Sequence, residues 1–311
     1  MALKEKKILV VGGTGFIGYH LVNFLKKKKF EVIVLSKRLP SKKKIIKGIK
    51  YIQFDISQKK NFQKLYNYQF NYIVNLGGYV DHANKKETFK THYLGVKNLA
   101  NYFLKKKIKL FIQMGSGGEY GNLKSPHKEN NICRSNFSSN YFYAKYLATK
   151  FLMNLSENNN FPATVLRLYQ TYGPMQETNR LLPFLITNCL KNKKFKTTHG
   201  RQYRDFIYIT DLIFIIYKCL INFQDIKNQI INIGFGKPLN IKKIIYKIMK
   251  ICKGGTPLFG SIELREDENL ITFPSIQKLK RLLFIVPKVN FEKGIKITIK
   301  SYKKLKVMLP R

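Results

Sequence analysis

The sequence predicts an α/β protein built around a doubly wound parallel sheet. In the first half, short runs of β-branched and apolar residues alternate with longer segments of helical period. A glycine-rich segment joins the first apolar run to the first helical segment, and the alternation changes its rhythm after about residue 170. Strands that alternate with helices are joined by parallel crossovers, so helices should cover both faces of one sheet.

Six apolar runs before residue 170 are predicted strands, because each is short and rich in β-branched or aromatic residues. They cover residues 7–11, 31–36, 49–54, 70–76, 108–114 and 163–169. Helical patterns separate most of them, notably 16–29, 86–106 and the segment that contains Tyr141. Residues 1–170 are therefore predicted to form the domain that carries the sheet.

Residues 171–311 are predicted to form a smaller lobe, with the chain able to cross between the two parts. Helical stretches near 180–192, 211–222 and 240–252 mix here with short strands at 205–209 and 229–234. Asn240 is expected to cap the third of these helices, and Gly254–Gly255 to end it.

The chain is strongly basic, with 58 Lys and Arg against 17 Asp and Glu and a formal net charge of +41. Such a charge can indicate a nucleic-acid or membrane partner. Here the lysines are dispersed in short runs without a long basic tail, so we expect a solvated surface, no nucleic acid and no membrane. The four cysteines are too widely spaced for a metal site. We therefore expect no metal and a reduced, cytoplasmic protein.

The segment "VVGGTGFIGYH" lies between the first predicted strand and the first predicted helix. Glycines at this place allow a tight turn and a close backbone approach, and the helix N-terminus offers N–H groups to a pyrophosphate. In an alternating fold this pattern predicts a Rossmann-type dinucleotide site. The cofactor-binding residues expected here are Gly12, Gly13, Thr14, Gly15, Phe16, Ile17 and Gly18.

The end of the second predicted strand should distinguish the two dinucleotides. A carboxylate there binds the ribose 2′-OH of NAD, whereas basic residues accommodate the 2′-phosphate of NADP. This sequence has Ser36, Lys37 and Arg38 and no carboxylate. NADP(H) is therefore favoured, with NAD(H) as the alternative.

These motifs resemble the extended short-chain dehydrogenase/reductases that act on nucleotide-linked sugars, over nearly the whole chain. By this resemblance Asp55 and Ile56 would lie near adenine, and Leu76 and Gly77 beneath the cofactor. Beyond the glycine loop, the matching segments are "FDI" (54–56), "NLGG" (75–78), "MGSGGEYG" (114–121), "NYFYAK" (140–145), "LRLYQTYGP" (166–174) and "YRDFIYITDL" (203–212).

The resemblance implies that Ser116, Tyr141 and Lys145 are catalytic, with Tyr141 and Lys145 also holding the cofactor. The Tyr-x-x-x-Lys spacing occurs seven times, where composition alone would give roughly three. Only the Tyr141 pair has a serine at a strand end before it and "LRLYQTYGP" after it. Tyrosine has a pKa of about 10, and Lys145 with an oxidised nicotinamide should lower it toward neutrality. Ser116 should orient the reacting oxygen.

Three positions depart from the pattern of the family. His92 and Gln170 replace frequent asparagines, so the details of proton relay stay open. Gly117–Gly118 stand where members that dehydrate sugars have an Asp-Glu pair. Two glycines cannot supply the extra acid and base of an elimination, so dehydration is not expected.

The resemblance also assigns residues to the substrate. Arg204 and Arg265 resemble the arginines that grip the nucleotide diphosphate, and Glu268 stands at the acidic position three residues after Arg265. Guanidinium groups suit phosphate oxygens. Asp81 and His82 either bind sugar hydroxyls or cap the following helix.

The leading functional hypothesis is an NADP(H)-dependent reductase of a nucleotide-diphospho-keto-sugar, of the 4-keto-6-deoxy type. The alternative is an NAD-dependent nucleotide-sugar 4-epimerase, which oxidises and re-reduces one carbon. A distant third is a non-catalytic dinucleotide- or nucleic-acid-binding protein. The resemblance further implies a homodimer through the helices near 86–106 and 139–156.

Overall fold

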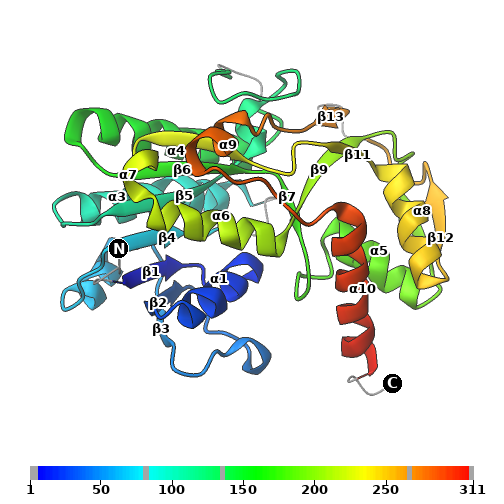
Figure 1. Ribbon diagram of the computed structural model, residues 1–311, viewed down its shortest axis with the longest axis horizontal. Helices are drawn as coiled ribbons and strands as arrows, with labels where there is room; N and C mark the ends of the chain where they lie inside the picture. The colour runs from blue at the N-terminus through cyan, green and yellow to red at the C-terminus, as the bar shows by residue number, and fades with distance from the viewer. Residues whose placement is uncertain (1–5, 80–83, 134–136, 265–267, 308–311) are drawn as a thin grey trace.

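A seven-stranded parallel sheet forms the centre of the protein (Figure 1). The structure is a computed structural model that describes residues 6–79, 84–133, 137–264 and 268–307. The strands follow the order β3-β2-β1-β4-β5-β6-β10, and every neighbouring pair is parallel. Their bounds are β1 Lys7–Val11, β2 Glu31–Ser36, β3 Lys50–Gln53, β4 Tyr72–Asn75, β5 Leu110–Ser116, β6 Ala163–Leu168 and β10 Gln229–Ile233.

Alternate residues of the strands enter two different cores. Ile8 and Val10 of β1 pack with helices α1 (Phe16–Lys27) and α6 (Ile209–Ile221). Leu9 and Val11 pack on the other face with α3 (Gly95–Leu104) and α4 (Asn140–Asn159). Because successive side chains of a strand point to opposite faces, continuous apolar strands need helices on both sides. The predicted doubly wound α/β class is confirmed.

The second half of the chain builds a smaller lobe but also returns to the large sheet. β10 pairs with β6, and α6 packs against α1. The division at residue 170 stays a prediction. Two further helices, α7 Phe223–Ile226 and α9 Gln277–Leu283, also contact α6 beside the large sheet. The other elements of the second half are β7 Gln170–Tyr172, β8 Lys194–Thr197, β9 Tyr203–Tyr208, β11 Pro238–Asn240, β12 Thr256–Phe259, β13 Ile271–Thr272, α5 Leu181–Leu190, α8 Ile241–Cys252 and α10 Phe291–Val307.

Two local predictions were wrong in detail. The segment predicted to be helical, 86–106, is divided into α2 (Lys85–Phe89), a π-helical turn (Lys90–Leu94) and α3. Asn240 does cap α8, accepting a hydrogen bond from the backbone N–H of Lys243, but the helix ends at Cys252 with Lys253, not a glycine, as its C-cap. Lys253 adopts the left-handed conformation, with a φ of +57°, and closes the helix by its own backbone N–H.

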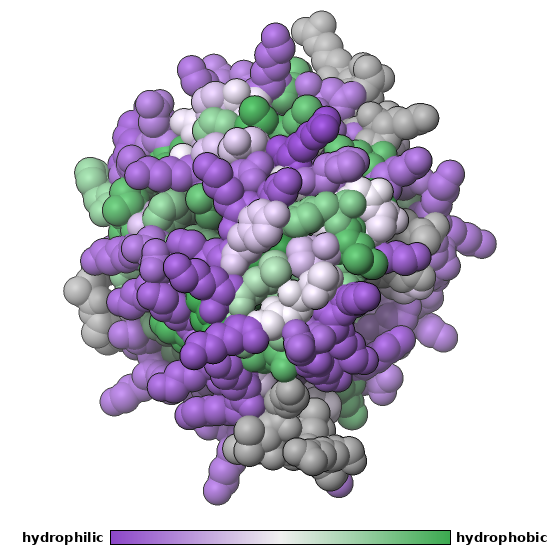
Figure 2. Space-filling view, turned by 90° about the vertical axis from the view of Figure 1, so that its right-hand side faces the viewer, coloured by the Kyte–Doolittle hydropathy of each residue, from purple (hydrophilic) through white to green (hydrophobic). Residues whose placement is uncertain are grey.

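The face that carries α8 and α10 is covered mainly by hydrophilic side chains (Figure 2). Lys242, Lys243 and Lys247 of α8 are exposed, while its isoleucines are buried. No helix among the described residues is both long and apolar enough to cross a membrane. Within the same part of the chain, no group of three or more His, Cys, Asp or Glu side chains could hold a metal ion.

Candidate active site

The glycine loop is packed so closely at Gly12 and Gly18 that side chains cannot replace these two glycines. Gly12 has a φ of +77°, and a Cβ there would lie 2.9 Å from the backbone nitrogen of Gly77. A Cβ on Gly18 would lie 2.3 Å from the carbonyl oxygen of Gly12. Gly15 is the N-cap of α1 without a side-chain cap, so the first N–H groups of the helix remain available to an anion. These features fit a dinucleotide pyrophosphate.

The other expected residues of this segment fix the loop in place. Thr14 and Ser36 join their hydroxyls at 2.6 Å, which ties the loop to the end of β2. Phe16 is buried in the core beneath α1, and Ile17 packs against the same core. Gly77 donates its N–H to Asn75 Oδ1 at 3.0 Å, directly after β4. The predicted loop residues thus gather at the carboxyl ends of β1, β2 and β4.

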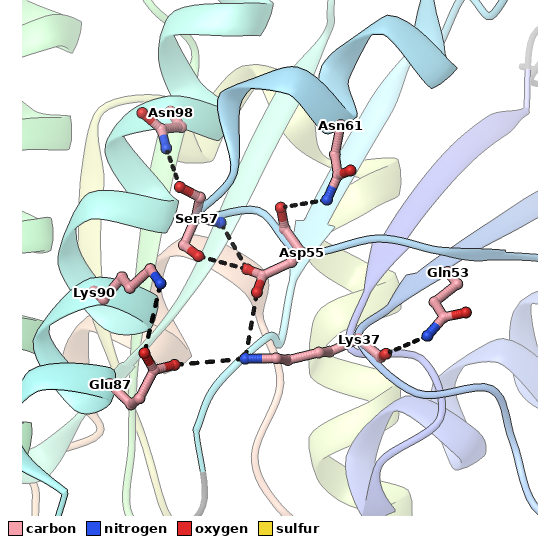
Figure 3. A network of polar contacts seen from close by, with 8 residues as sticks. All are labelled: Lys37, Gln53, Asp55, Ser57, Asn61, Glu87, Lys90 and Asn98. Carbon is pink, nitrogen blue, oxygen red and sulfur yellow. Dashed lines mark hydrogen bonds and ion pairs between the residues drawn. The ribbon is translucent and has the colours of Figure 1, made fainter.

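The basic residues after β2 do not behave alike. Lys37 Nζ lies 3.3 Å from Asp55 Oδ2 and 3.5 Å from Glu87 Oε2 (Figure 3). Arg38 is exposed and forms no ion pair with any residue that the structure describes. The sequence predicted Lys37 and Asp55 as separate contacts of the cofactor, whereas the structure joins them. Glu87 was missed, because it is 50 residues from Lys37 in sequence.

Hydrogen bonds fix Asp55 and Ile56 after β3. Asp55 Oδ1 accepts from the backbone N–H of Ser57 at 2.9 Å and from its hydroxyl at 2.7 Å. Burial opposes the charged carboxylate, but these bonds and Lys37 outweigh it and hold the pKa of Asp55 below its usual value. Asn98 of α3 donates to the carbonyl oxygen of Ile56 at 3.2 Å. The side chain of Leu76 packs against the core on the opposite side of the loop.

Ser116, Tyr141 and Lys145 lie together where β5 meets α4. Ser116 is the last residue of β5, and its hydroxyl forms a hydrogen bond with Tyr141. Ser139 caps α4 by accepting the N–H of Phe142, so Tyr141 lies in the first turn. Lys145 Nζ lies 5.9 Å from the ring centre of Tyr141 and donates to the carbonyl oxygen of Met114 at 2.7 Å.

Desolvation dominates the pKa values of Tyr141 and Lys145 in the protein without cofactor. The pKa of Tyr141 is raised to about 12, because burial and the nearby Glu119 raise it by more than Arg180 and the bond to Ser116 lower it. Burial also lowers the pKa of Lys145 to about 8, with Glu119 acting in the opposite direction. The shift toward phenolate expected with an oxidised nicotinamide bound stays a prediction, whereas the protein without cofactor keeps Tyr141 protonated at neutral pH. The reason is desolvation, which disfavours each charged form.

Glu119 is a buried carboxylate of the site that the sequence analysis missed. Its side chain is fully enclosed and accepts hydrogen bonds from the backbone N–H of Ser116 at 2.7 Å, Thr149 Oγ1 at 2.7 Å and Arg167 Nε at 2.9 Å. Thr149 lies one turn beyond Lys145 on α4, and Arg167 lies on β6. Glu119 thus fastens the strand that carries Ser116 to the helix that carries Tyr141.

Gly117 and Gly118 are covered by aromatic rings. A Cβ on Gly117 would lie 2.7 Å from Tyr169 Cζ, and one on Gly118 would lie 2.1 Å from Phe142 Cδ1. Real Cβ atoms essentially never come this close, so larger side chains would require the rings to move. The loop therefore lacks both the carboxylates of a dehydratase and the space for them.

His92 lies beside Tyr141 because of the π-helical turn. The two ring centres are 4.7 Å apart in an edge-to-face arrangement. His92 Nε2 also lies 3.1 Å from the backbone nitrogen of Tyr79. Such turns often occur at functional sites. Neither its position here nor the exposed Arg180 at the start of α5 was predicted.

The six other tyrosines of the Tyr-x-x-x-Lys pattern lie in different environments. Tyr120 is fully buried and donates to Asn232 Oδ1 at 2.8 Å. Tyr146 packs against Phe137, with ring centres 5.0 Å apart. The remaining four contact aromatic rings or a backbone carbonyl: Tyr93 (Phe89), Tyr102 (Phe62 and Phe103), Tyr246 (Phe259) and Tyr302 (the carbonyl of Gln176).

Arg204 of β9 is held by an acidic partner. Its NH2 lies 2.5 Å from Glu268 Oε1, and its NH1 donates to the carbonyl oxygen of Leu270 at 3.2 Å. Burial lowers the pKa of Arg204, and Glu268 acts in the opposite direction. The predicted substrate residue Arg265 lies outside the described residues, as do Asp81 and His82.

Comparisons with known proteins find relatives that span nearly the whole chain. CDP-abequose synthase from Salmonella muenchen is 24% identical over 298 residues, which is 94% of this chain and 96% of that protein. A putative UDP-glucose 4-epimerase from Methanocaldococcus jannaschii is 26% identical over 302 residues, 93% of this chain and 96% of that protein. Both are named for nucleotide-linked sugars.

Solved structures show the same fold. UDP-glucose 4-epimerase from Thermotoga maritima, determined with UDP-glucose, has a TM-score of 0.89 at 23% identity and covers 96% of this chain and 99% of that chain. Other structures of this fold were determined with NAD. A model of the NAD dependent epimerase/dehydratase family matches residues 8–234, and this chain belongs to that family.

Proposed function

We propose that this protein is an NADP(H)-dependent reductase of a nucleotide-diphospho-keto-sugar, of the 4-keto-6-deoxy type. The observation that carries the proposal is the hydrogen bond between Ser116 and Tyr141, beside a loop whose one carboxylate, Glu119, is enclosed. Reduction of a carbonyl consumes a proton from one donor. With a pKa of about 12, Tyr141 is that donor in its protonated form at neutral pH.

In this proposal each residue of the cluster has a separate role. The dinucleotide, when bound, supplies the hydride. Ser116 orients the sugar carbonyl by a hydrogen bond to its oxygen, and Tyr141 donates the proton to that oxygen. Lys145, fixed by the carbonyl of Met114, places a cation beside the phenol and stabilises the phenolate that remains. Arg204 binds the diphosphate of the substrate, together with Arg265.

Elimination of water does not fit the same loop. Gly117 and Gly118 carry no side chain, and the neighbouring carboxylate of Glu119 is fully enclosed. Its two oxygens are engaged by Ser116, Thr149 and Arg167, so it cannot exchange a proton with a sugar. Reduction and epimerisation both need only one acid–base group, and they remain the two candidates.

The preference for NADP(H) rests on the segment after β2. Ser36, Lys37 and Arg38 include no carboxylate, and exposed Arg38 has no ion-pair partner among the described residues. A guanidinium group binds a phosphate monoester through paired N–H donors. The candidate 2′-phosphate site therefore has two cations. Arg38 has no ion-pair partner among the described residues, and Lys37 is paired with Asp55 and Glu87.

A nucleotide-sugar 4-epimerase is the second candidate, favoured by the relative from Methanocaldococcus jannaschii. Such an enzyme oxidises the sugar first, so Tyr141 must begin as the base. The segment after β2, which has basic residues and lacks the carboxylate of an NAD site, places the reductase first.

Products decide between the candidates. The purified protein is incubated with CDP-, UDP-, dTDP- and GDP-linked 4-keto-6-deoxy sugars and with NADPH or NADH, and products are identified by mass spectrometry and NMR. We expect one NADPH consumed for each sugar reduced. Interconversion of two sugars without net loss of cofactor would establish the epimerase instead.

We also propose a homodimer through α3 and α4, as the sequence indicated. Leu94, before α3, and Tyr143, on α4, are both large and exposed, at 40% and 43%. Size-exclusion chromatography with light scattering should give twice the chain mass of 36.4 kDa. The cytoplasmic location stays a prediction of the sequence.

A further inference from the structure

Lys37 is held between two carboxylates at the adenosine end of the dinucleotide site (Figure 3). Its ammonium lies 3.3 Å from Asp55 and 3.5 Å from Glu87. The carboxylates come from different elements, since Asp55 follows β3 and Glu87 lies in α2, beyond β4. Lys37 therefore joins the segments that follow β2, β3 and β4, around the place proposed for the adenosine.

The two carboxylates are held to different degrees. Asp55 is fixed by two hydrogen bonds from Ser57. Among the described residues, the carboxylate of Glu87 contacts only Lys37 and Lys90, each at 3.5 Å, and its side chain is 27% exposed. Breaking the ion pair between Glu87 and Lys37 therefore costs little free energy, because an exposed ion pair contributes little to stability.

A phosphate on the ribose 2′-OH would bring a third anion to Lys37. One ammonium cannot neutralise three anions that lie within a few ångströms of it, and like charges at such distances repel. Asp55 stays in place through Ser57, so the competition falls between the phosphate and Glu87. Without the 2′-phosphate, the ion pair of Lys37 with Glu87 can persist.

We propose that Glu87 sets how strongly this protein prefers a 2′-phosphorylated dinucleotide, by competing with the 2′-phosphate for Lys37. Glu87 is a positioning residue here, since it acts through Lys37. The inference rests on the dinucleotide part of the proposed function and is independent of which sugar is reduced.

Binding of two adenosine phosphates tests the inference without a sugar substrate. Isothermal titration calorimetry measures the affinity of the purified protein for 2′,5′-ADP and for 5′-AMP, which differ only in the 2′-phosphate. In Glu87→Gln we expect 2′,5′-ADP to bind about threefold more tightly, the size of one exposed ion pair. Binding of 5′-AMP should be unchanged.

The matched control is Glu31→Gln, which removes one negative charge away from Lys37. Glu31 pairs with Lys7 at 2.9 Å at the opposite end of β2. We expect no change in the affinity for either ligand. An equal gain in Glu31→Gln would show that net charge alone is responsible and would overturn the inference.

A second pair of variants separates competition from direct repulsion. If Glu87 acts through Lys37, the gain from Glu87→Gln disappears in a Lys37→Gln background. A gain of the same size in both backgrounds would overturn the inference. A wild type that prefers 2′,5′-ADP without responding to Glu87→Gln would overturn it too, while leaving the NADP(H) part of the proposed function intact. A wild type that binds both ligands equally, with no response to the variant, would contradict both.

Discussion

Two ion-pair clusters lie at the same edge of the large sheet, one at each end of the candidate site. At the catalytic end, Glu119 and Arg167 are enclosed, with side chains 0% and 7% exposed. At the adenosine end, the side chain of Lys37 is 59% exposed and meets two partly exposed carboxylates. Both clusters join separate strands and helices, but only the first is shielded from water.

The difference teaches what each cluster can do. A buried pair is expensive to break, because one unpaired charge would remain in a poorly polarisable interior. Glu119 therefore fixes Ser116 and α4 relative to each other. An exposed pair is weak and screened by salt, so it can open for a ligand. The buried cluster fixes the geometry of the candidate catalytic residues. The exposed cluster can open when the proposed dinucleotide binds.

Breaking the buried pair should have the largest effect. In Glu119→Gln, Arg167 loses its carboxylate, and we expect the free energy of unfolding to fall by about 3–5 kcal/mol. Urea unfolding followed by circular dichroism measures it, with Glu87→Gln as the control at the adenosine end. The double variant Glu119→Gln/Arg167→Met should recover part of the loss. Equal losses of unfolding free energy in Glu119→Gln and Glu87→Gln would contradict the difference between the buried and the exposed cluster.

The buried lysine should make stability depend on pH. The pKa of Lys145 is about 8 in the folded protein against 10.5 in the unfolded chain. Between these values the unfolded chain binds more protons, so stability rises with pH. Relative to Lys145→Met, the wild type should gain up to about 3 kcal/mol as pH rises from 8 past 10. Unfolding at a series of pH values measures this, and a constant difference would contradict it.

The exposed cluster should show the smallest effect. We expect Lys37→Gln to change the free energy of unfolding by about 0.5 kcal/mol or less, and the change to vanish in 1 M NaCl. Urea unfolding at low and high salt measures it. A loss above about 2 kcal/mol that persists in high salt would show that this cluster is also structural.

Most of the sheet could be predicted, because continuous apolar strands and amphipathic helices have distinct periods. The predicted range 31–36 is β2 itself, and 7–11 is β1. The π-helical turn was missed because Lys90–Leu94 continues the helical pattern of its neighbours. The left-handed Lys253 was missed because glycine, which follows it, is the usual residue for that conformation.

The grouping of the candidate catalytic residues could be predicted, whereas the electrostatics around them could not. Motif order brought Ser116, Tyr141 and Lys145 together, and the structure places them in one cluster. In the sequence, Glu119 looks like a polar residue of a glycine-rich loop. Its burial could not be predicted, because it depends on Arg167 from a strand far along the chain. The sequence shows Tyr141 one turn before Lys145, but it does not show the burial that raises the pKa of this phenol in the protein without cofactor.

The central claim is that Tyr141 donates the proton during reduction. The most direct measurement compares NADPH oxidation by Tyr141→Phe and Tyr143→Phe on the keto-sugar that the wild type reduces. Tyr143 lies on the same helix, and Tyr143→Phe keeps the ring that the proposed dimer would cover, so this variant controls for loss of a hydroxyl from α4. We predict a fall of about 100-fold or more for Tyr141→Phe and a rate within about twofold of wild type for Tyr143→Phe. Equal rates in the two variants would contradict the account.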